Sequence, residues 1–419
     1  MLEQAEQQTV YSQIKNYNFQ EKKISKGAKK TAHVATVEIA GCKVKEITNQ
    51  YWTAKQRQAS SLHEVAYRAC FKPQLPRFFI ELLTKPGDIV YDPFSGRGTT
   101  ALEAGLLGRN VIANDINPLS RVLSEARLFV PDISTVESRL KEINLNKKVK
   151  ASLDLSMFYH DDTYNEIMNL KNYLLKKKKN KLLDSVDLWI QMVATNRLTV
   201  HSPGFFSVYT LPPNLAVSAE SQTKINKKLR QRPEYRNVKE IILRKTKQLI
   251  RNVADEQKRN LVKVGTKAIF LNQDARTTKS IRSNSVQLTV TSPPFLDIVQ
   301  YAQDNWLRCW FNSLDALKIS QNITSSKSVE EWSVVMKDVL SELYRVTKRG
   351  GYVAFEVGEV RKKSIQLERH IVPLGQAVGF SCQAILINQQ NFTKTANIWG
   401  IKNNHRGTNT NRIVLFSKS

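Results

Sequence analysis

In two parts of the chain, short apolar runs alternate with segments whose apolar residues have the spacing of a helix. The runs at 89–91, 110–114, 266–271 and 286–290 are rich in Val, Ile and Leu and are bounded by turn residues, which is typical of strands covered on both faces. An apolar segment of helical period, 99–107, lies between the first two runs. A chain in which strands alternate with helices predicts an α/β domain with a mostly parallel sheet.

The C-terminal part of the chain predicts a different arrangement. Residues 330–346 have the apolar spacing of an amphipathic helix, and the turn residues at 348–351 lead into a strand at 352–357. Two further apolar runs, 384–387 and 412–416, are separated by a polar segment. We expect these two runs to pair as an antiparallel hairpin.

Between residues 130 and 265 the alternation of strands and helices stops. The segment has helical apolar spacing and many lysines, and its loop at 201–214 mixes aromatic and turn residues ahead of basic residues gathered in 224–236. Long insertions are usually functional, and aromatic rings with cations suit contacts to bases and phosphates. We interpret 130–265 as a candidate target-recognition segment; a helical cap with a solvated basic face is the alternative.

The composition adds a strong positive charge. Lys and Arg total 64 of the 419 residues against 37 Asp and Glu, which gives a formal net charge of +27. This excess favours a polyanionic partner, with nucleic acid ahead of a membrane surface; a general solubility bias is the alternative. Lysines between 22 and 30 predict a basic N-terminal arm, and 33–44 has the pattern of a short strand pair.

The sequence argues against several other classes of protein. No apolar run approaches the roughly 20 residues of a membrane span, and the N-terminus lacks a secretory signal pattern. We therefore expect a cytoplasmic protein without membrane contact. The four cysteines are irregularly spaced and the six histidines have no ligand spacing, so we expect neither a disulfide framework nor a metal site.

A glycine-containing turn follows the first predicted strand. Its sequence is Asp92-Pro93-Phe94-Ser95-Gly96-Arg97-Gly98-Thr99-Thr100. Gly96 and Gly98 allow a tight strand-to-helix turn that brings the backbone close to a ligand, and Asp115 lies about 20 residues further on, where an acid typically binds ribose hydroxyls. The turn also fits the GxGxxA pattern of a nicotinamide-nucleotide site, but Asp92 would repel a pyrophosphate and suits the cationic S-adenosylmethionine.

The strand 286–290 ends in the run Thr291-Ser292-Pro293-Pro294-Phe295. Neither proline has an N–H to donate, so the chain leaves the sheet in a rigid, extended form. The Ser292 hydroxyl and the proline carbonyls become fixed acceptors beside the ring of Phe295. Fixed acceptors next to a stacking ring suit the exocyclic amine of a flat base, whereas a strand-ending turn with a core phenylalanine is the alternative.

In this order, each after a strand, the motifs resemble those of the amino-methyltransferases of DNA, in particular the cytosine-N4 group. The resemblance rests on the glycine turn, on Asn114-Asp115-Ile116-Asn117-Pro118 and on Thr291-Ser292-Pro293-Pro294-Phe295. It implies the class I methyltransferase fold, a seven-stranded, mostly parallel, Rossmann-like sheet flanked by helices and closed by an antiparallel hairpin. It also implies S-adenosylmethionine as cofactor and double-stranded DNA as partner, and leaves open whether a cognate restriction endonuclease accompanies the chain.

The resemblance implies roles for individual residues as well. Phe71 and Lys72 match the segment that covers the methionine moiety, Asp115 the acid at the ribose, and Asp274 the acid at the adenine edge. The complete set of expected cofactor contacts is Phe71, Lys72, Asp92, Phe94, Gly96, Gly98, Thr99, Asp115 and Asp274. Arg97 departs from the small residue that is common in the turn.

Ser292 marks the cytosine-N4 group, because adenine-N6 relatives carry Asp or Asn there. We expect direct methyl transfer to N4 of a cytosine flipped out of the duplex. Ser292 and the Pro293 carbonyl would accept from the amine, Pro294 would complete the corner, and Phe295 would stack on the base. No covalent intermediate is needed, consistent with the lack of a Pro-Cys nucleophile. An adenine-N6 enzyme, an RNA amino-methyltransferase and a non-catalytic nucleic-acid-binding protein on this scaffold are the alternatives.

These expectations divide the chain into three parts. Residues 1–50 are the basic N-terminal arm, 51–129 and 266–419 together are the methyltransferase catalytic domain, and 130–265 is the inserted helical segment. A role in DNA methylation, as in a restriction-modification system, places the protein in the cytoplasm, at the nucleoid.

Overall fold

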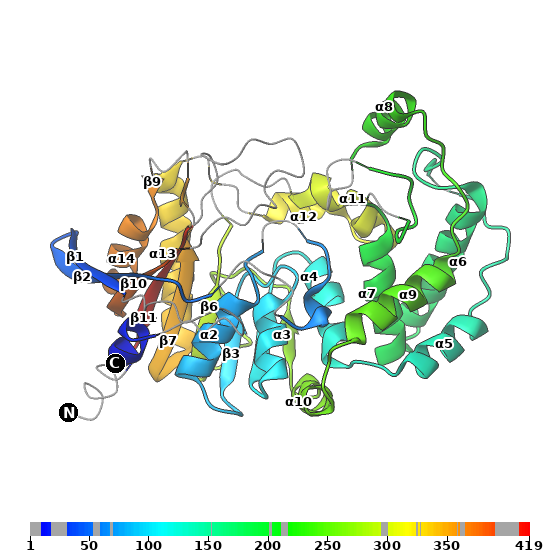
Figure 1. The fold of residues 1–419 in the computed structure, drawn as a ribbon. Coiled ribbons are helices and arrows are strands. Elements are labelled where there is room, and N and C mark those ends of the chain that lie inside the picture. The colour runs from blue at the N-terminus through cyan, green and yellow to red at the C-terminus, as the bar shows by residue number, and fades with distance from the viewer. Residues whose placement is uncertain are drawn as a thin grey trace, which may run out of the picture.

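Nine strands form one sheet through the molecule, in the order β1-β2-β10-β11-β7-β6-β3-β4-β5 (Figure 1). Their bounds are β1 His33–Ile39, β2 Cys42–Asn49, β3 Ile89–Asp92, β4 Asn110–Asn114, β5 Ile269–Leu271, β6 Val286–Thr291, β7 Thr347–Val357, β10 Ser381–Gln389 and β11 Thr410–Ser417. The short strands β8 Glu359–Val360 and β9 Ile365–Gln366 pair separately. The computed structural model describes residues 10–17, 32–52, 59–67, 70–151, 153–200, 203–210, 217–294, 301–323, 326, 328–357, 359–360, 365–389 and 410–419.

The central part of the sheet is parallel. Strands β5, β4, β3, β6 and β7 run in the same direction, and the hairpin of β10 and β11 joins β7 through an antiparallel pairing. The predicted mostly parallel sheet closed by an antiparallel hairpin is therefore confirmed, but the sheet has nine strands instead of the seven expected, because β2 pairs with β10 and β1 with β2. Because parallel strands end at the same edge, the loops that follow β3, β4, β5 and β6 meet there.

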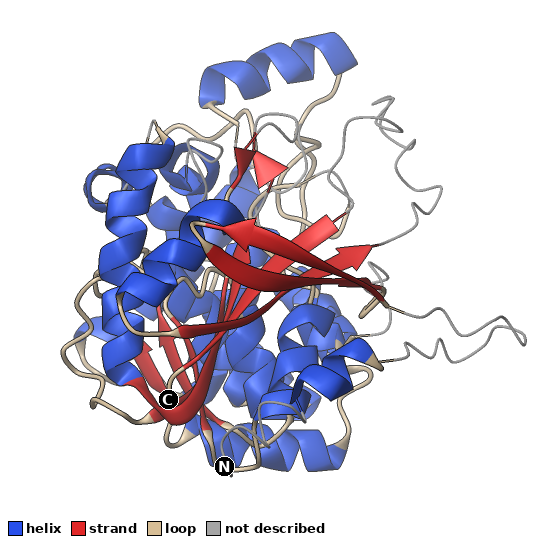
Figure 2. Ribbon diagram, turned by 90° about the vertical axis from the view of Figure 1, so that its left-hand side faces the viewer, coloured by secondary structure: helices blue, strands red, loops and turns tan. Residues whose placement is uncertain are grey.

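Helices cover both faces of the sheet (Figure 2). Helices α13 Val329–Val346 and α14 Glu368–Ala377 pack on one face, and α2 Gln74–Leu83, α3 Thr99–Leu106 and α10 Asp255–Gly265 on the other. Neighbouring strand residues alternate between the two faces: Tyr91 packs with the α13 side and Val90 with the α2 side. This alternation explains the continuous apolar runs in the sequence, since both faces of each central strand are buried.

Two sequence predictions need correction. The arm predicted over 1–50 does not hold for 33–49, because β1 and β2 form the predicted strand pair and β2 adds in parallel to β10; the lysines between 22 and 30 lie outside the described residues. The turn predicted at 348–351 lies inside β7 instead of before it: β7 begins at Thr347, its register against β6 shifts between Thr347 and Tyr352, and Gly350 has a left-handed φ of 70°.

The inserted segment is helical where the structure describes it, as predicted. It contains α5 Ile133–Glu142, α6 Asp161–Lys179, α7 Ser185–Arg197, α8 Ala219–Leu229 and α9 Val238–Ile250 in addition to α10. Its core includes Trp189 and Phe158 and also packs around η2 Ser61–His63, α4 Leu119–Ser124, η3 Glu125–Leu128 and α11 Tyr301–Phe311. Phe205 and Phe206 of the aromatic loop are buried, so these two rings are not available for base contacts.

Two helices lie between β6 and α13 in the chain. Helices α11 and α12 Ala316–Asn322 lie at the top of Figure 1, above the carboxyl ends of the parallel strands. In the described part of the chain, none of the helices has the length and apolar character that crossing a membrane requires.

Gly375 gives a test of the packing between α14 and the sheet. A Cβ atom at this position would overlap the ring of Phe416 on β11. Alanine normally stabilises a helix interior by roughly 1 kcal/mol relative to glycine, but we expect Gly375→Ala to lower the free energy of unfolding by about 1–3 kcal/mol through overpacking. Urea denaturation measures this, with Gln376→Ala as the control; a more stable Gly375→Ala protein would contradict the packing described.

Candidate active site

The turn after β3 is built on two glycines in the left-handed region. Gly96 has a φ of 53° and Gly98 a φ of 74°, which L side chains rarely adopt. A Cβ on Gly98 would also lie 2.6 Å from Cβ of Ser124, whereas the space beside Gly96 is bounded by the Tyr67 ring at 3.5 Å. Both positions therefore need glycine for the direction of the backbone, and Gly98 needs it also for its close packing against Ser124.

Two polar residues at the end of β4 fix this turn. Asp115 accepts hydrogen bonds from the backbone N–H of Gly96 at 2.8 Å and of Asn117 at 2.9 Å. The buried Asn114 side chain donates to the Pro93 carbonyl at 3.1 Å and to the Gln273 carbonyl at 2.9 Å. The loops after β3, β4 and β5 are thus tied together. Burial raises the pKa of Asp115 to about 6, in spite of these hydrogen bonds.

Asp92 has a different position from the one the sequence suggests. Its carboxylate is buried and accepts from the Thr291 hydroxyl at 2.7 Å and from the Phe94 N–H at 3.1 Å. Burial raises the pKa of Asp92 to about 7. The carboxylate points into the protein between β3 and β6, so the expectation that it faces a cationic ligand is not supported. Instead, it joins the glycine turn to the loop that begins with Ser292.

Ser292 is hydrogen-bonded to an acid that the sequence does not single out. Glu356 on β7 is 8% exposed, and its carboxyl group accepts from the Asn411 side chain at 2.5 Å and makes a hydrogen bond with the Ser292 side chain. Burial raises the pKa of Glu356 to about 7. Glu356 lies within an apolar strand pattern, and only the register of β7 against β6, which pairs Phe355 with Thr291, reveals its place beside Ser292.

One cavity, of about 110 Å³, opens at this edge of the sheet. Its polar wall comes from the loops after the parallel strands, and its apolar wall from α13 and the segment after α12. It is lined by Tyr67, Pro93, Phe94, Gly96, Asn114, Asp115, Ile116, Asn117, Gln273, Asp274, Ala275, Arg276, Ser292, Pro294, Asn322, Ile323, Ser326, Trp332, Val335, Met336 and Val339.

The cavity brings together part of the set expected from the sequence. Phe94, Gly96, Asp115, Asp274, Ser292 and Pro294 line it. Phe71, Lys72, Asp92, Gly98, Thr99 and Pro293 do not: Phe71 packs on the core beneath the sheet and Thr99 is buried. Phe295 lies outside the described residues. Contacts of Phe71 and Lys72 with a cofactor stay a prediction.

Asp274 lines the cavity together with Arg276, which the sequence analysis did not select. The Arg276 guanidinium donates to both carboxylate oxygens of Asp274, at 3.0 Å and 2.5 Å. This ion pair lowers the pKa of Asp274. Any ligand group that binds Asp274 must therefore share the carboxylate with Arg276. The Pro294 carbonyl is also engaged, since it accepts from the Trp332 indole N–H at 3.0 Å.

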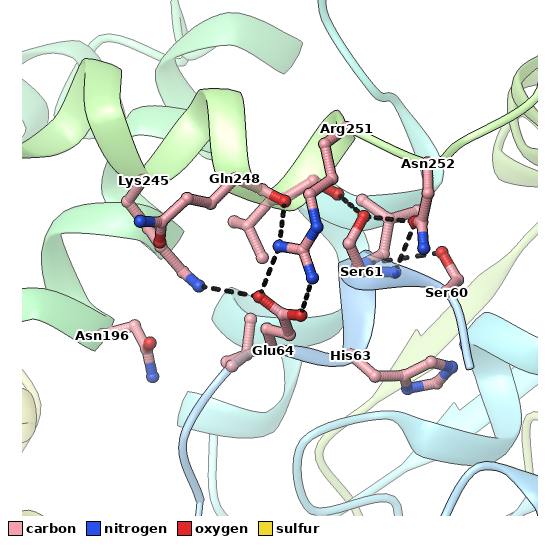
Figure 3. Close-up of polar contacts among 12 residues, drawn as sticks. Ser60, Ser61, His63, Glu64, Asn196, Lys245, Gln248, Arg251 and Asn252 are labelled. Atoms are coloured by element: carbon pink, nitrogen blue, oxygen red, sulfur yellow. Dashed lines mark hydrogen bonds and ion pairs between the residues drawn. The ribbon is translucent and has the colours of Figure 1, made fainter. Parts of the chain in front are cut away.

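Tyr67 lines the cavity and ends a segment, 61–67, that the inserted helices hold in place. Figure 3 shows Glu64 between Lys245 and Arg251 of the α9 region, and Ser61 beside Asn252. The N–H of Ser61 donates to Asn252 at 2.8 Å. Ser61–His63 form a one-turn 3₁₀-helix, and the next residue, Glu64, forms an ion pair with Arg251 just after α9.

Arg97 also holds this segment. Its guanidinium is buried and donates to the carbonyls of His63 at 3.2 Å and Val65 at 3.0 Å. Arg127, fully buried as well, donates to the Leu62 carbonyl at 3.1 Å and to the carbonyl of Arg97. Arg97 therefore turns away from the cavity, and its departure from the usual small residue serves to attach the glycine turn to the wall that carries Tyr67.

No metal centre is apparent at this site. Among the residues that the structure describes, no group of three or more His, Cys, Asp or Glu side chains is arranged to hold a metal ion. All four cysteines are free thiols.

Part of the chain is similar to a family of known proteins. A family model described as DNA methylase matches residues 2–123, a segment that includes the glycine turn and Asp115. Over 123 residues the chain is 31% identical to the type II methyltransferase M.MjaII of Methanocaldococcus jannaschii, which covers 29% of this chain and 23% of that protein. A methylase match at this turn supports S-adenosylmethionine as the ligand of the cavity.

Two further relatives have names that describe different activities. The type II methyltransferase M.BsoBI of Geobacillus stearothermophilus is 22% identical over 277 residues, 62% of this chain and 54% of that protein. A tRNA (guanine(10)-N2)-dimethyltransferase of Methanocaldococcus jannaschii is 33% identical over 108 residues, 22% of this chain and 30% of that protein. The chain thus spans between about a quarter and about half of the length of these relatives.

The raised pKa of Asp92 predicts a pH dependence of stability. An aspartate has a pKa near 3.9 in the unfolded chain, so between about pH 4 and pH 7 the folded state holds a proton that the unfolded state has lost, and stability falls as the pH rises through this window. Asp92→Asn keeps an acceptor for Thr291 and removes this proton. We expect a smaller loss of stability from pH 5 to pH 8 than in the parent.

Chemical denaturation at pH 5 and pH 8 measures the difference. Asp132→Asn, at an exposed helix start without a side-chain cap, is the control and should follow the parent. An Asp92→Asn protein that loses as much stability as the parent would show that Asp92 is ionised in the folded state at both pH values.

Proposed function

We propose that this protein transfers the methyl group of S-adenosylmethionine to N4 of a cytosine flipped out of duplex DNA. One observation carries the proposal: the glycine turn and the Ser292 corner follow adjacent parallel strands, share one cavity, and are joined by the hydrogen bond from Thr291 to Asp92. A methyl donor held at the first loop would lie beside an acceptor held at the second.

The cavity suits the cofactor chemically. Asp115 keeps lone pairs for ribose hydroxyls while two backbone N–H groups hold its carboxylate in place. Asp274 is available to an adenine edge through a carboxylate that Arg276 orients. The apolar side chains of Trp332, Val335 and Met336 cover the opposite side. S-adenosylmethionine, when bound here, supplies an electrophilic methyl group on a sulfonium.

Ser292 is the group that would act on the target amine. An exocyclic amine delocalises its lone pair into the base and is a weak nucleophile until acceptors bind its hydrogens. Ionised Glu356 can only accept a hydrogen bond, so Ser292 donates its single hydrogen to Glu356 and presents its lone pairs to the cavity. The Pro293 carbonyl is proposed as the second acceptor, and Phe295 as the ring that stacks on the base.

The same pair offers a route for the proton that the amine must lose. Once the methyl group is attached, the nitrogen carries a positive charge and releases a proton to the Ser292 oxygen as Ser292 passes its own proton to Glu356. A carboxyl group with a pKa of about 7 is well matched to this exchange near neutral pH. Positioning and this proton path would supply the acceleration, without a covalent intermediate.

The same chemistry applies to two alternative substrates. Adenine N6 would use the same acceptors. The similarity to a tRNA (guanine(10)-N2)-dimethyltransferase is the observation in favour of an RNA amine as the alternative. Mass spectrometry of nucleosides from DNA and RNA treated with the protein and labelled cofactor separates them: N4-methylcytosine in DNA is expected, and label found only in N6-methyladenine or in RNA would refute the cytosine assignment. No label in any nucleic acid would favour a non-catalytic binding protein.

Removal of the Ser292 hydroxyl tests its role. We expect Ser292→Ala to lower the turnover number by about 10²-fold or more, because one acceptor and the proton path are removed together. Affinity for S-adenosylhomocysteine, measured by calorimetry, should stay within about twofold, as the hydroxyl is assigned to the target base.

Thr289→Val is the matched control for this variant, since Thr289 carries a buried hydroxyl on β6, the strand that leads to Ser292, outside the cavity lining. It should retain nearly the turnover of the parent. Equal turnover of Ser292→Ala and Thr289→Val would remove Ser292 from the mechanism.

The raised pKa of Glu356 predicts how turnover depends on pH. Turnover should rise with pH through about 7 as Glu356 ionises and Ser292 becomes a donor to it. Glu356→Gln keeps the size of the side chain but cannot ionise, so its turnover should be low, and this rise with pH should disappear. A parent profile that is flat between pH 6 and pH 8, or an unchanged rise in Glu356→Gln, would speak against this role.

A further inference from the structure

Helix α8 stands apart from the body of the protein, at the top of Figure 1, on the same side as α11 and α12. Of its 11 residues, Gln222 alone is buried, and Leu229 is 46% exposed. Most helices in proteins owe their stability to the packing of an apolar face. The position of α8 must therefore depend on something other than hydrophobic burial.

Amide side chains fix α8 on the protein instead. Gln222 donates to the Tyr209 carbonyl at 2.9 Å and to the Asn226 side chain at 2.7 Å. Asn226 donates to the Met157 carbonyl at 2.7 Å. Gln231, just after the helix, repeats the contacts of Gln222 with Tyr209 and Asn226, at 2.9 Å and 2.8 Å. Such directional bonds define the orientation of a helix without covering its surface.

The base of α8 is also tied to the active-site side of the molecule. The Trp306 indole N–H on α11 donates to the Val217 carbonyl at 3.2 Å, two residues before the helix. Trp306 also packs edge-on against Phe158, with ring centroids 6.0 Å apart. Helix α11 is the first element after the Ser292 corner in the chain. The orientation of α8 is thus set relative to the element that follows the catalytic loop.

The exposed surface of α8 is basic. Lys224, Lys227 and Lys228 are exposed on the helix, and Arg230 and Arg232 are exposed directly after it. The one acid of the helix, Glu220, pairs with Lys224 at 2.5 Å. The surface therefore carries four cations beyond the single ion pair. An exposed basic helix held by polar contacts has the charge that a polyanionic partner requires.

The backbone conformation of Arg230 is unusual for its residue type. It lies at the C-terminal end of α8 with a φ of 50° and a ψ of 40°, a conformation in which glycine is usual at helix ends. An arginine at this position is strained for its side chain type. The Arg230 side chain is exposed at this end of the helix, close to Lys227 and Lys228 in the chain.

We propose that α8 is a duplex-DNA contact helix whose cations bind the phosphate backbone beside the flipped base. This proposal rests on the proposed function and adds the surface that holds the substrate. Double-stranded DNA carries a phosphate about every 1.7 Å of axis, and its major groove, roughly 12 Å wide, admits a helix. The major groove of an RNA duplex is too narrow for side chains to read, so a protruding helix favours DNA.

A charge-matched pair of variants tests the proposal. The first variant replaces Lys227, Lys228 and Arg230 by Gln. The control replaces Lys176, Lys178 and Lys179, which are exposed at the end of α6, by Gln and so removes the same charge from the same segment. Binding of a mixed-sequence duplex of about 40 base pairs, long enough to extend past a flipped base on both sides, is measured by fluorescence anisotropy on the full chain. The titration is run without cofactor over a range of salt concentrations.

We expect the α8 variant to bind at least tenfold more weakly, with the slope of log affinity against log salt reduced by about 0.9 for each phosphate that the variant no longer neutralises. The α6 control should bind within about twofold of the parent, because long-range charge effects are screened at moderate salt. Equal weakening in both variants would overturn the proposal, since only net charge would then matter. A parent that binds single-stranded RNA and no duplex DNA would overturn it as well.

Arg230→Gly separates binding from stability. Glycine relieves the left-handed conformation, so the thermal midpoint should be equal to or above that of the parent, while duplex affinity falls. Unchanged affinity in this variant and in the α8 triple variant would reject α8 as the contact surface. Because binding is measured without methyl transfer, absence of the proposed chemistry alone, with α8-dependent binding intact, would count against the enzyme assignment and not against α8.

Discussion

The buried hydrogen bond between the Thr291 hydroxyl and the Asp92 carboxylate holds together the two loops on which the proposed chemistry depends. Strand pairing brings β3 and β6 side by side, but the ladder ends where the loops begin, and both loops leave the sheet with residues that cannot continue it. A carboxylate buried at this point is costly unless it is satisfied. Its donors include the Thr291 hydroxyl at the end of β6 and the Phe94 N–H in the glycine turn, so the relative position of these two segments is the condition for burying the acid.

Three buried or partly buried acids lie at or behind the cavity of a protein that is basic overall. Asp92, Asp115 and Glu356 all have pKa values raised by burial, while the chain carries a net charge of +27. Asp115 lines the cavity, whereas Asp92 and Glu356 are buried behind it, so these acids lie inside the protein and the exposed surface is left to the cations. Buried Arg97 and Arg127 contribute little to the surface field, because their guanidinium groups point into the protein and bind backbone carbonyls.

The sequence predicts the fold well where local pattern decides the outcome. Apolar runs bounded by turns give the central strands, and the terminal hairpin follows from two such runs. Gly96 and Asp115 are found from their spacing because the physical requirement, a left-handed backbone and an acid one strand away, is local. The N-terminal strands are harder to assign, since β2 depends on an edge that is formed by β10, more than 300 residues away.

The candidate site shows the same limit. Nothing in the sequence tells whether the Asp92 side chain faces the cavity or the core, because that is decided by Thr291 on another strand. Glu356 and Tyr67 join the site only through the register of β7 and the attachment of the segment at 61–67. The aromatic loop misleads for the opposite reason: Phe205 and Phe206 match a base-binding composition, but both rings are buried, and Phe206 belongs to the core of the inserted helices.

The addition of β2 to β10 has one further consequence. Without it, the central sheet would end at β10, a nine-residue strand whose outer N–H and C=O groups would be open to strands from other molecules. Native proteins shield such edges, since bare ones promote self-association. The two N-terminal strands move the sheet margin to β1, a strand with charged and half-exposed positions. A version of the chain shortened to begin at residue 50 would therefore retain the loops after β3 and β6 and yet be prone to aggregate.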